Sequence, residues 1–258
     1  MGILNVTPDS FSDGAQFPSA ALAAEAGRRM VDEGAAILDI GGESTRPGAA
    51  SVPVAEELRR VLPVIDALRP LPVILSVDTR KPAVMRAAIG QGADLVNDVR
   101  ALRDPGAIEA VAQSQAGVCL MHMQGEPATM QSAPRYDDVV NEVVAFLLRQ
   151  AQACELAGIA RARILLDPGF GFGKTLDHNI ALLDGLPKLS ETGYPILAGL
   201  SRKSMLGTIT GRAVSERLSG SIALAVLALE RGVRVLRVHD VGATVDAVRV
   251  WSALRYAN

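Results

Sequence analysis

The feature that most constrains the fold of this chain is a repeated alternation of short apolar runs with longer amphipathic segments. Eight runs have the pattern of buried strands: Gly2–Val6, Ile37–Ile40, Val73–Val77, Leu95–Val99, Val118–Met121, Ile164–Leu166, Ile196–Leu200 and Val235–Val238. A helical pattern follows each of them, over Ala20–Glu33, Ala55–Leu68, Pro82–Gln91, Pro105–Ser114, Tyr136–Ala157, Leu176–Ser190, Ser215–Arg231 and Ala243–Leu254. This alternation is typical of βα units around a parallel sheet.

Eight such units predict an α/β fold, a single-domain (β/α)8 TIM barrel over residues 1–258 with its site at the C-terminal ends of the strands. The 258-residue length suits that fold, and a composition that is 49% hydrophobic but only 3% aromatic suits parallel strands covered by helices. An open doubly wound sheet is the alternative, but no Gly-x-Gly-x-x-Gly sequence follows the first strand. Because that strand begins almost at Met1, we expect no element ahead of it at the N-terminal mouth of the barrel.

Charge and cysteine content exclude several classes of protein. The formal net charge is -2 without a basic run, so we expect no attraction to nucleic acid or to an anionic membrane surface. Cys119 and Cys154 form neither a disulfide framework nor a metal-ligand spacing. No signal peptide and no apolar run long enough to cross a bilayer are evident. The sequence therefore predicts a cytoplasmic protein whose partners are small molecules.

Polar residues end every predicted strand, which is where the active site of a barrel lies. In chain order they are Asn5, Asp39 with residues 41–47, Asp78, Asn97 with Asp98, His122, Asp167, residues 201–203 and residues 237–240. Helix caps would explain one or two of these ends, but not all eight. We therefore expect one site that all the strands build together.

Some of these residues have structural interpretations. Asp39 slightly precedes its loop, so a buried structural acid is the favoured interpretation. Asp98 and Asp240 either anchor loop amides or face the substrate. His122 and His178 are interpreted as hydrogen-bonding loop residues, because no second His or Cys lies at a metal-ligand spacing.

The glycine-rich segment over residues 169–175 is similar to a phosphate-binding loop but lacks one required glycine. Pro168 stands at that position, so the motif fails. We expect the glycines instead to turn the chain beneath a planar ligand, with Phe170 or Phe172 beside it.

Basic residues predict an anion-binding part of the site. Arg237 and His239 lie two residues apart on one strand and so point to the same side, at the part of the barrel where phosphate sites commonly form. Arg46 adds a positive charge after the second strand. The amide oxygen of Asn5 is a hard neutral ligand that suits Mg2+ retaining several waters, carried by a phosphorylated group.

Acidic residues predict a second part that binds a nitrogen heterocycle. Asp78 and Asp167, with Asn97 between them in strand order, have only Lys203 as an obvious cation. Buried carboxylates need donors, and an aminopyrimidinone ring offers adjacent N–H groups. The sequence therefore predicts a site that holds a heterocycle at one end and a phosphate at the other.

Six segments together resemble the dihydropteroate synthase family: GILNVTPDSFSD (2–13), DIGGESTRPG (39–48), SVDT (76–79), DPGFGFGK (167–174), SRKS (201–204) and RVHD (237–240). The resemblance implies condensation of 7,8-dihydropterin-6-ylmethyl pyrophosphate with 4-aminobenzoate, giving 7,8-dihydropteroate and pyrophosphate. It also implies Mg2+ and a homodimer. The long first and second loops, with Asp9, Phe11, Ser44 and Pro47, are expected to fold over the site.

The resemblance also implies residue roles. Asn5 corresponds to the metal-linked asparagine. The pterin-binding set is Asp78, Asn97, Asp167 and Lys203, and the pyrophosphate contacts are Thr45, Arg46, Arg237 and His239. Met121 and Phe172 resemble walls of the pocket, and Ser204 resembles the contact to the aminobenzoate carboxylate. Catalysis is expected to rest on Arg237, His239, Lys203 and Arg46 through stabilisation of the departing anion.

Three other functions fit parts of the pattern. A corrinoid methyltransferase-like barrel would share the pterin pocket but would not need the cations at 201–203 and 237–239. A non-catalytic paralogue would bind pterin without turnover. A phosphate-sugar enzyme would need a Schiff-base lysine or a catalytic glutamate at a strand end, for which Glu43 is the only weak candidate.

Overall fold

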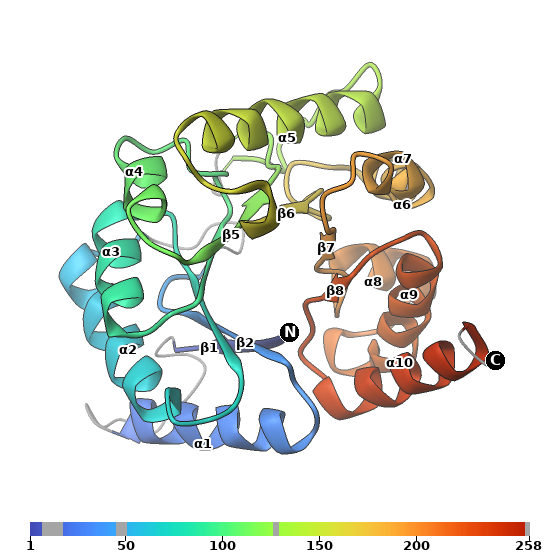
Figure 1. The fold of residues 1–258 in the computed structure, drawn as a ribbon. Coiled ribbons are helices and arrows are strands. Elements are labelled where there is room, and N and C mark those ends of the chain that lie inside the picture. Colours follow the sequence, from blue (N-terminus) through green and yellow to red (C-terminus); the bar gives the residue numbers. More distant parts are fainter. Residues whose placement is uncertain (7–17, 45–50, 126–128, 256–258) are drawn as a thin grey trace.

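The computed structural model describes residues 1–6, 18–44, 51–125 and 129–255 and has the predicted barrel architecture (Figure 1). Its strands are β1 (Gly2–Asn5), β2 (Ile37–Gly41), β3 (Ile74–Asp78), β4 (Leu95–Asp98), β5 (Gly117–Met121), β6 (Ile164–Asp167), β7 (Leu197–Ala198) and β8 (Val235–Leu236). Strands β1 to β6 form one parallel sheet in chain order, and β7 pairs with β8. Single parallel bridges, Leu166 with Ile196 and Gly2 with Val238, join the two sheets into a ring.

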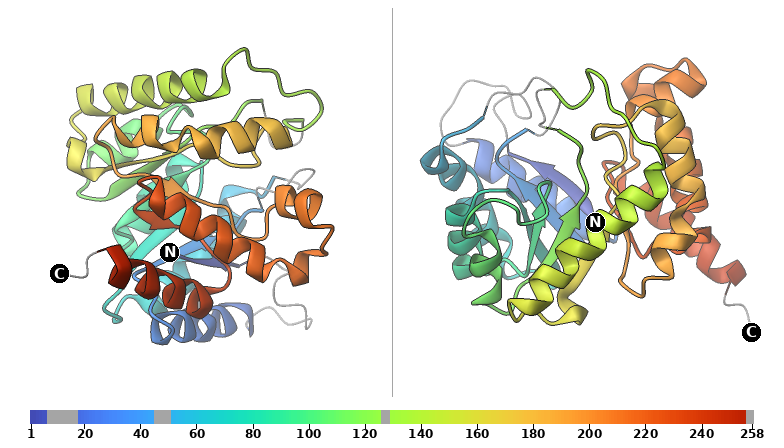
Figure 2. Two further views of the ribbon diagram at one scale, coloured as in Figure 1. Left: turned by 90° about the vertical axis from the view of Figure 1, so that its right-hand side faces the viewer. Right: turned by 90° about the horizontal axis from the view of Figure 1, so that it is seen from above.

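Helices surround this ring of strands (Figures 1 and 2). They are α1 (Pro18–Asp32), α2 (Val54–Leu68), α3 (Pro82–Gln91), α4 (Ala107–Ala112), α5 (Val139–Leu156), α6 (Leu176–Asp184), α7 (Leu186–Ser190), α8 (Ser204–Thr210), α9 (Leu218–Glu230) and α10 (Val241–Arg255). Two short 3-10 turns, η2 (Arg161–Arg163) and η3 (Val214–Glu216), complete the order. The outer layer closes where the amide of Gly242 donates to Glu33 Oε2 at 3.1 Å.

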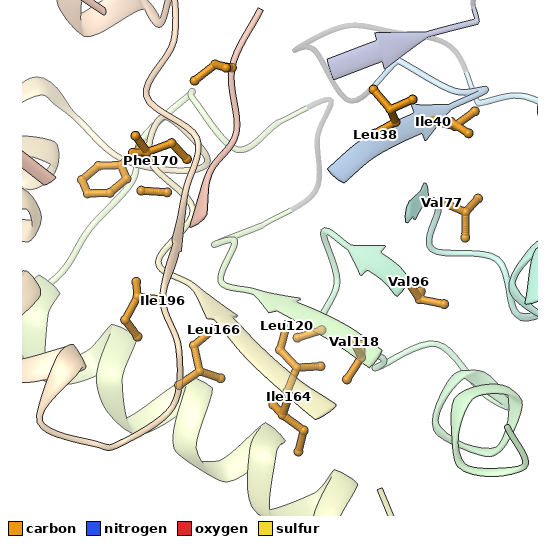
Figure 3. Close-up of a cluster of buried hydrophobic side chains, with 14 of the residues drawn as sticks. Leu38, Ile40, Val77, Val96, Val118, Leu120, Ile164, Leu166, Phe170 and Ile196 are labelled. Atoms are coloured by element: carbon orange, nitrogen blue, oxygen red, sulfur yellow. The ribbon is translucent and has the colours of Figure 1, made fainter. Parts of the chain in front are cut away.

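Side chains of the strands alternate between two surroundings. Ile40, Val77 and Val96 stand in one register row, are fully buried, and pack with helix residues in the main core (Figure 3). The neighbouring row carries Gly41 and polar residues instead. Because side chains of a strand alternate in direction, the apolar row faces the helices and the polar row faces the barrel interior.

One predicted helix is divided in the structure, and one helix of the structure was not predicted. The helix expected over Leu176–Ser190 is two helices, since α6 ends at Asp184 with Gly185 as its C-cap, and Pro187 lies at the start of α7. A Cβ on Gly185 would lie 2.6 Å from Val140, so the chain passes too close to α5 for a larger residue. The helix α8 was not predicted, because seven residues are too few to show a clear amphipathic period.

Several element ends also differ from the prediction. Strands β7 and β8 pair over only two residues each, and Ile196 and Val238 contribute isolated bridges. Helix α5 begins three residues later than expected, because Asp138 caps it by accepting a hydrogen bond from the amide of Asn141 at 3.0 Å. Among the helices in the described ranges, none combines the length and the apolar character needed to span a membrane.

Candidate active site

Backbone register brings Asn5, Asp78 and Asn97 to one level of the barrel. Asn5 pairs with Gly41, Gly41 with Asp78, and Asp78 with Asn97, so the three side chains share the inward-facing row. A Cβ on Gly41 would lie 3.7 Å from both Asn5 Oδ1 and Asp78 Oδ2. The glycine therefore leaves space beside both oxygen atoms.

Arg237 crosses the barrel interior to reach two carboxylates. Its Nε donates to Asp39 Oδ2 at 2.6 Å, and its Nη2 donates to Asp78 Oδ2 at 2.8 Å. The prediction that Lys203 is the only obvious cation near Asp78 is therefore wrong. Closure of the barrel is the reason, because it places the end of β8 beside β1, where the amide of Ile3 donates to Val238 O at 3.0 Å.

Asp39 is the common hydrogen-bond acceptor in the cluster around Arg237. It is fully buried, and it accepts hydrogen bonds from Ser76 Oγ at 2.6 Å and from Asn97 Nδ2 at 2.9 Å in addition to Arg237. The predicted structural acid is thus confirmed, and its hydrogen-bond partners are side chains. Asn97 Oδ1 is buried and accepts no hydrogen bond from any residue within the described ranges, so it remains available to a ligand donor.

One guanidinium shared by two carboxylates leaves this cluster with an excess of negative charge. Burial raises the pKa of Asp78 to about 7, Arg237 opposes the rise, and the charge of Asp39 adds to it. The pKa of Arg237 is raised, because the attraction of Asp39 and Asp78 outweighs the effect of burial. A ligand that donates hydrogen bonds would relieve this excess of negative charge.

Asp167 ends β6 and shapes the turn that follows it. Its Oδ1 accepts a hydrogen bond from the amide of Gly169 at 2.7 Å, and burial raises its pKa. Asp167 pairs with Met121 in the register of β5 and β6. The carboxylate therefore lies beside Met121 on the neighbouring strand end.

Lys174 binds carbonyl groups of the glycine-rich turn and was not predicted as part of the site. This buried ammonium donates to Gly169 O at 2.9 Å and to Phe172 O at 3.1 Å, and it lies 3.0 Å from His122 Nδ1. Burial lowers the pKa of Lys174 to about 7 and that of His122 to about 3. The predicted hydrogen-bonding role of His122 is confirmed. A lysine at the end of the alternating glycine and phenylalanine run over residues 169–173 was the available signal, but it suggested anion binding rather than binding of backbone carbonyls.

Lys203 and Phe172 lie against each other and form another side of the candidate site. The Nζ atom of Lys203 lies 4.2 Å from the centroid of the Phe172 ring, a cation–π distance. Burial lowers the pKa of Lys203 to about 8, and the charge of Asp167 opposes this change. Phe172 also packs against the small apolar cluster that contains Met121. Ser204 begins α8 with an exposed side chain directly after Lys203.

The loops after β7 and β8 are joined by their side chains. Ser201 Oγ lies 3.0 Å from His239 Nδ1, and Arg202 Nε donates to Asp240 Oδ2 at 3.0 Å. Asp240 therefore pairs with a guanidinium rather than with loop amides. Asp98, in contrast, does anchor its loop, since it accepts from the amides of Arg100 and Leu102 at 2.8 Å each.

Two of the predicted site residues, Thr45 and Arg46, lie outside the described residues, and so do Asp9, Phe11 and Pro47 of the two long loops. Among the described residues, no group of three or more His, Cys, Asp or Glu side chains is arranged to hold a metal ion.

Glu43, the weak candidate for a catalytic glutamate, has structural partners. Its Oε2 accepts from Lys81 Nζ at 2.5 Å and from the amide of Val52 at 2.8 Å.

Known proteins resemble this chain along nearly its whole length. A family model described as "Pterin binding enzyme" matches residues 1–239. The dihydropteroate synthase of Escherichia coli K12 is 54% identical over 254 residues, which are 98% of this chain and 90% of that protein.

Solved structures give the same result. Xanthomonas albilineans dihydropteroate synthase with 4-aminobenzoic acid has a TM-score of 0.93 and 55% identity, over 99% of this chain and 92% of that one. Burkholderia cenocepacia dihydropteroate synthase complexed with 7,8-dihydropteroate has a TM-score of 0.90 and 55% identity, over 99% of this chain and 91% of that one. The predicted barrel, the predicted family and the synthase function are thereby confirmed. The chain belongs to the dihydropteroate synthase family of pterin-binding enzymes.

Proposed function

We propose that this synthase uses the interior cluster around Arg237 to condense 7,8-dihydropterin-6-ylmethyl pyrophosphate with 4-aminobenzoate. The observation that carries the proposal is the convergence, at one end of the barrel, of buried acceptors with the basic groups Arg237 and Lys203. The acceptors are Asp78, Asn97 and Asp167. Acceptors suit the heterocycle, and cations suit the departing pyrophosphate.

The pterin is proposed to bind through its N–H groups. Asp78 and Asp167 offer carboxylate oxygens, and Asn97 Oδ1 is a buried acceptor without a partner in the described part of the chain. A carboxylate that accepts paired N–H donors forms charge-assisted hydrogen bonds, which are stronger than neutral ones. Lys203 closes this pocket together with Phe172.

The chemical step needs no nucleophile from the protein. The aminobenzoate nitrogen forms the new C–N bond, the C–O bond to pyrophosphate breaks, and the amine then loses one proton. The pterin ring delocalises the positive charge that develops on the methylene carbon. Arg237 and His239 are proposed to stabilise the departing anion, a contribution typically of several kcal/mol per well-placed group. Arg46 and Thr45 stay predictions for the same end of the substrate.

Mg2+ is proposed as the cofactor, with Asn5 as its ligand from the protein. The donor set fits, because Asn5 is half-buried and its Oδ1 is a neutral oxygen that borders the space left by Gly41, as Asp78 Oδ2 also does. When bound there, Mg2+ would neutralise charge on the pyrophosphate oxygens.

The aminobenzoate is proposed to lie between Phe172 and the start of α8. Phe172 offers a flat half-buried surface, and the exposed Ser204 hydroxyl suits a carboxylate. Met121 would form the inner wall, where it packs with Phe172.

We also propose that residues 1–258 form one domain and that two copies form a homodimer. Large apolar side chains are exposed on the successive segments α8, η3, α9 and α10: Ile209, Val214, Leu218, Leu227, Val250 and Leu254. Such a surface suits contact with another copy. Sedimentation equilibrium tests the dimer, and a monomer at micromolar concentration would contradict it. The cytoplasmic location stays a prediction.

A direct assay tests the proposed reaction. The purified protein is mixed with the dihydropterin pyrophosphate, 4-aminobenzoate and Mg2+, and both dihydropteroate and pyrophosphate are quantified. We expect equimolar formation of the two products and loss of both in the presence of a chelator. Binding of the pterin without pyrophosphate release would contradict the proposal.

A further inference from the structure

The paired strands β7 and β8 end just before the residues proposed to bind pyrophosphate. The last backbone hydrogen bond beyond this two-residue ladder is donated by the amide of Arg237 to Ala198 O at 3.0 Å. The amide of Val238 donates to Met1 O at 2.9 Å, on the side of β1. The amide of His239, which follows, donates to the side chain of Ser201, with 3.3 Å between N and Oγ. The hydroxyl of Ser201 thus substitutes for a strand carbonyl.

The same hydroxyl also contacts the imidazole ring of His239. Ser201 Oγ lies 3.0 Å from His239 Nδ1, and the serine is buried. A hydroxyl has one hydrogen to donate and two lone pairs that accept. Since one lone pair accepts from the His239 amide, the hydrogen is free to be donated.

The direction of the second hydrogen bond follows from what else surrounds Ser201. Within the described ranges, its hydroxyl has no hydrogen-bond partner other than these two nitrogen atoms of His239. If Nδ1 carried the ring hydrogen, both nitrogen atoms would donate to Oγ, and the hydroxyl hydrogen would have no acceptor there. A buried donor without an acceptor is costly, so the hydroxyl donates to Nδ1.

We propose that Ser201 is a positioning residue that donates to Nδ1 of His239 and so places the ring hydrogen on Nε2, where it can be donated to pyrophosphate. The inference rests on the proposed contact between His239 and pyrophosphate. It assigns the nitrogen that makes this contact and the residue that selects it.

A second contact keeps the loop in place when Ser201 is changed. Arg202, which follows Ser201, binds Asp240 through Nε and Nη2, and its amide donates to Ser221 Oγ at 3.0 Å. The guanidinium of Arg217 in turn donates to Arg202 O at 3.1 Å. A Ser201→Ala variant therefore loses the contacts to His239 while the neighbouring contacts remain.

Nitrogen-15 NMR of histidine-labelled protein tests the inference directly. The chain has three histidines, so a His239→Gln variant assigns the His239 signals. We expect the wild-type ring to show a protonated Nε2 and an unprotonated Nδ1. In Ser201→Ala the two nitrogen shifts should move towards each other as the tautomers mix, and Ser201→Thr, which keeps the hydroxyl, should restore them.

Binding of inorganic pyrophosphate in the presence of Mg2+ provides the functional measurement. Loss of one oriented hydrogen bond predicts about fivefold weaker binding in Ser201→Ala. Affinity for the pterin alone should change less than about twofold, since it does not involve this hydrogen bond. Ser114→Ala is the matched control, because among the residues that the structure describes its hydroxyl bonds only within the turn after α4. It donates to Val111 O at 2.8 Å and accepts from Ala116 N at 3.1 Å.

Three results would overturn the inference: a wild-type ring protonated on Nδ1, an unchanged spectrum in Ser201→Ala, or unchanged pyrophosphate affinity in that variant. The proposed function is tested separately. Unchanged pyrophosphate affinity in His239→Gln would remove the proposed contact itself, whatever the NMR spectra show.

Discussion

The six-stranded sheet and the β7–β8 pair position their site residues in different ways. In the sheet, register alone places Asp78 beside Asn97 and Asp167 beside Met121. The β7–β8 pair has only two residue pairs and meets the sheet through single bridges. Its site residues are held by side chains instead, through the contacts of Arg237 with Asp39 and of Ser201 with His239.

This difference separates two kinds of sensitivity to mutation. Where the backbone places a carboxylate, changing the carboxylate should alter ligand binding and leave the fold intact. Where ion pairs place a cation, changing the cation should alter both ligand binding and the stability of the fold. The following predictions test that distinction.

The largest effect is expected for Arg237→Ala. It leaves Asp39 and Asp78 without their shared cation, which should reduce the free energy of unfolding by about 3 kcal/mol. Loss of anion stabilisation should also lower kcat/KM at least about 100-fold. Urea unfolding and initial rates of pyrophosphate release measure the two effects.

Arg234→Ala is the control for that variant, because this arginine is exposed and lies just before β8. Its unfolding free energy should change by less than about 0.5 kcal/mol. A fully active or fully stable Arg237→Ala enzyme would contradict the idea that ion pairs hold this part of the site.

Asp167→Asn should weaken pterin binding without disturbing the fold. The asparagine oxygen can still accept from the Gly169 amide, so the turn keeps its hydrogen bond and only the charge is lost. The lost charge assistance predicts about 10- to 100-fold weaker pterin binding by calorimetry, with unchanged urea unfolding. Asp177→Asn, an exposed residue of α6, is the control and should bind pterin normally. Unfolding of Asp167→Asn at lower urea would show that the carboxylate is needed for the turn itself.

His122 should make the free energy of unfolding of the protein depend on pH. Burial lowers its pKa to about 3 from the ordinary value of 6.5, so between these values the unfolded chain binds a proton that the native chain does not. The free energy of unfolding should therefore fall as the pH drops below about 6.5, by up to about 1.4 kcal/mol per pH unit.

Urea unfolding of the wild type and of His122→Gln, measured from roughly pH 7.5 to roughly pH 5, checks this expectation. This range covers the pH values at which the free energy of unfolding should begin to fall. The variant should show a shallower slope than the wild type. His178→Gln is the control, because glutamine at this position of α6 preserves the capping box with Thr175. Equal slopes in the wild type and in His122→Gln would exclude His122 as the source.

The smallest effect is expected for Arg202→Met. The pair between Arg202 and Asp240 is partly exposed, so its loss should reduce the free energy of unfolding by about 1 kcal/mol or less. Pyrophosphate affinity should change by less than about twofold, since Ser201 still contacts His239. An effect as large as that of Arg237→Ala would mean that the whole β7–β8 region depends on this one pair.

The sequence was sufficient to locate the strands and the end of the barrel that holds the site. Apolar runs such as residues 118–121 mark strands buried on both faces, and a parallel barrel then directs Asp78 and Asp167 to one rim. These inferences depend only on local pattern and on topology. They are the features that the backbone of the six-stranded sheet determines.

Partners across the interior could not be predicted in the same way. Arg237 lies 198 residues from Asp39 and 159 from Asp78, and no local pattern links them. The buried Lys174 was missed because its acceptors are backbone carbonyls, which any sequence provides. The break between α6 and α7 at Gly185 was also missed. The close packing of this glycine against α5 is a tertiary contact that composition does not reveal.

Gly169 has a consequence for how this enzyme can vary. Its backbone has φ +68°, and a Cβ there would lie 1.9 Å from the carbonyl oxygen of His122. Even one methyl group would push apart the ends of two adjacent strands and displace the Asp167 carboxylate that the Gly169 amide holds. An inhibitor that rests on this backbone would meet a surface that point mutation cannot reshape without disabling the enzyme.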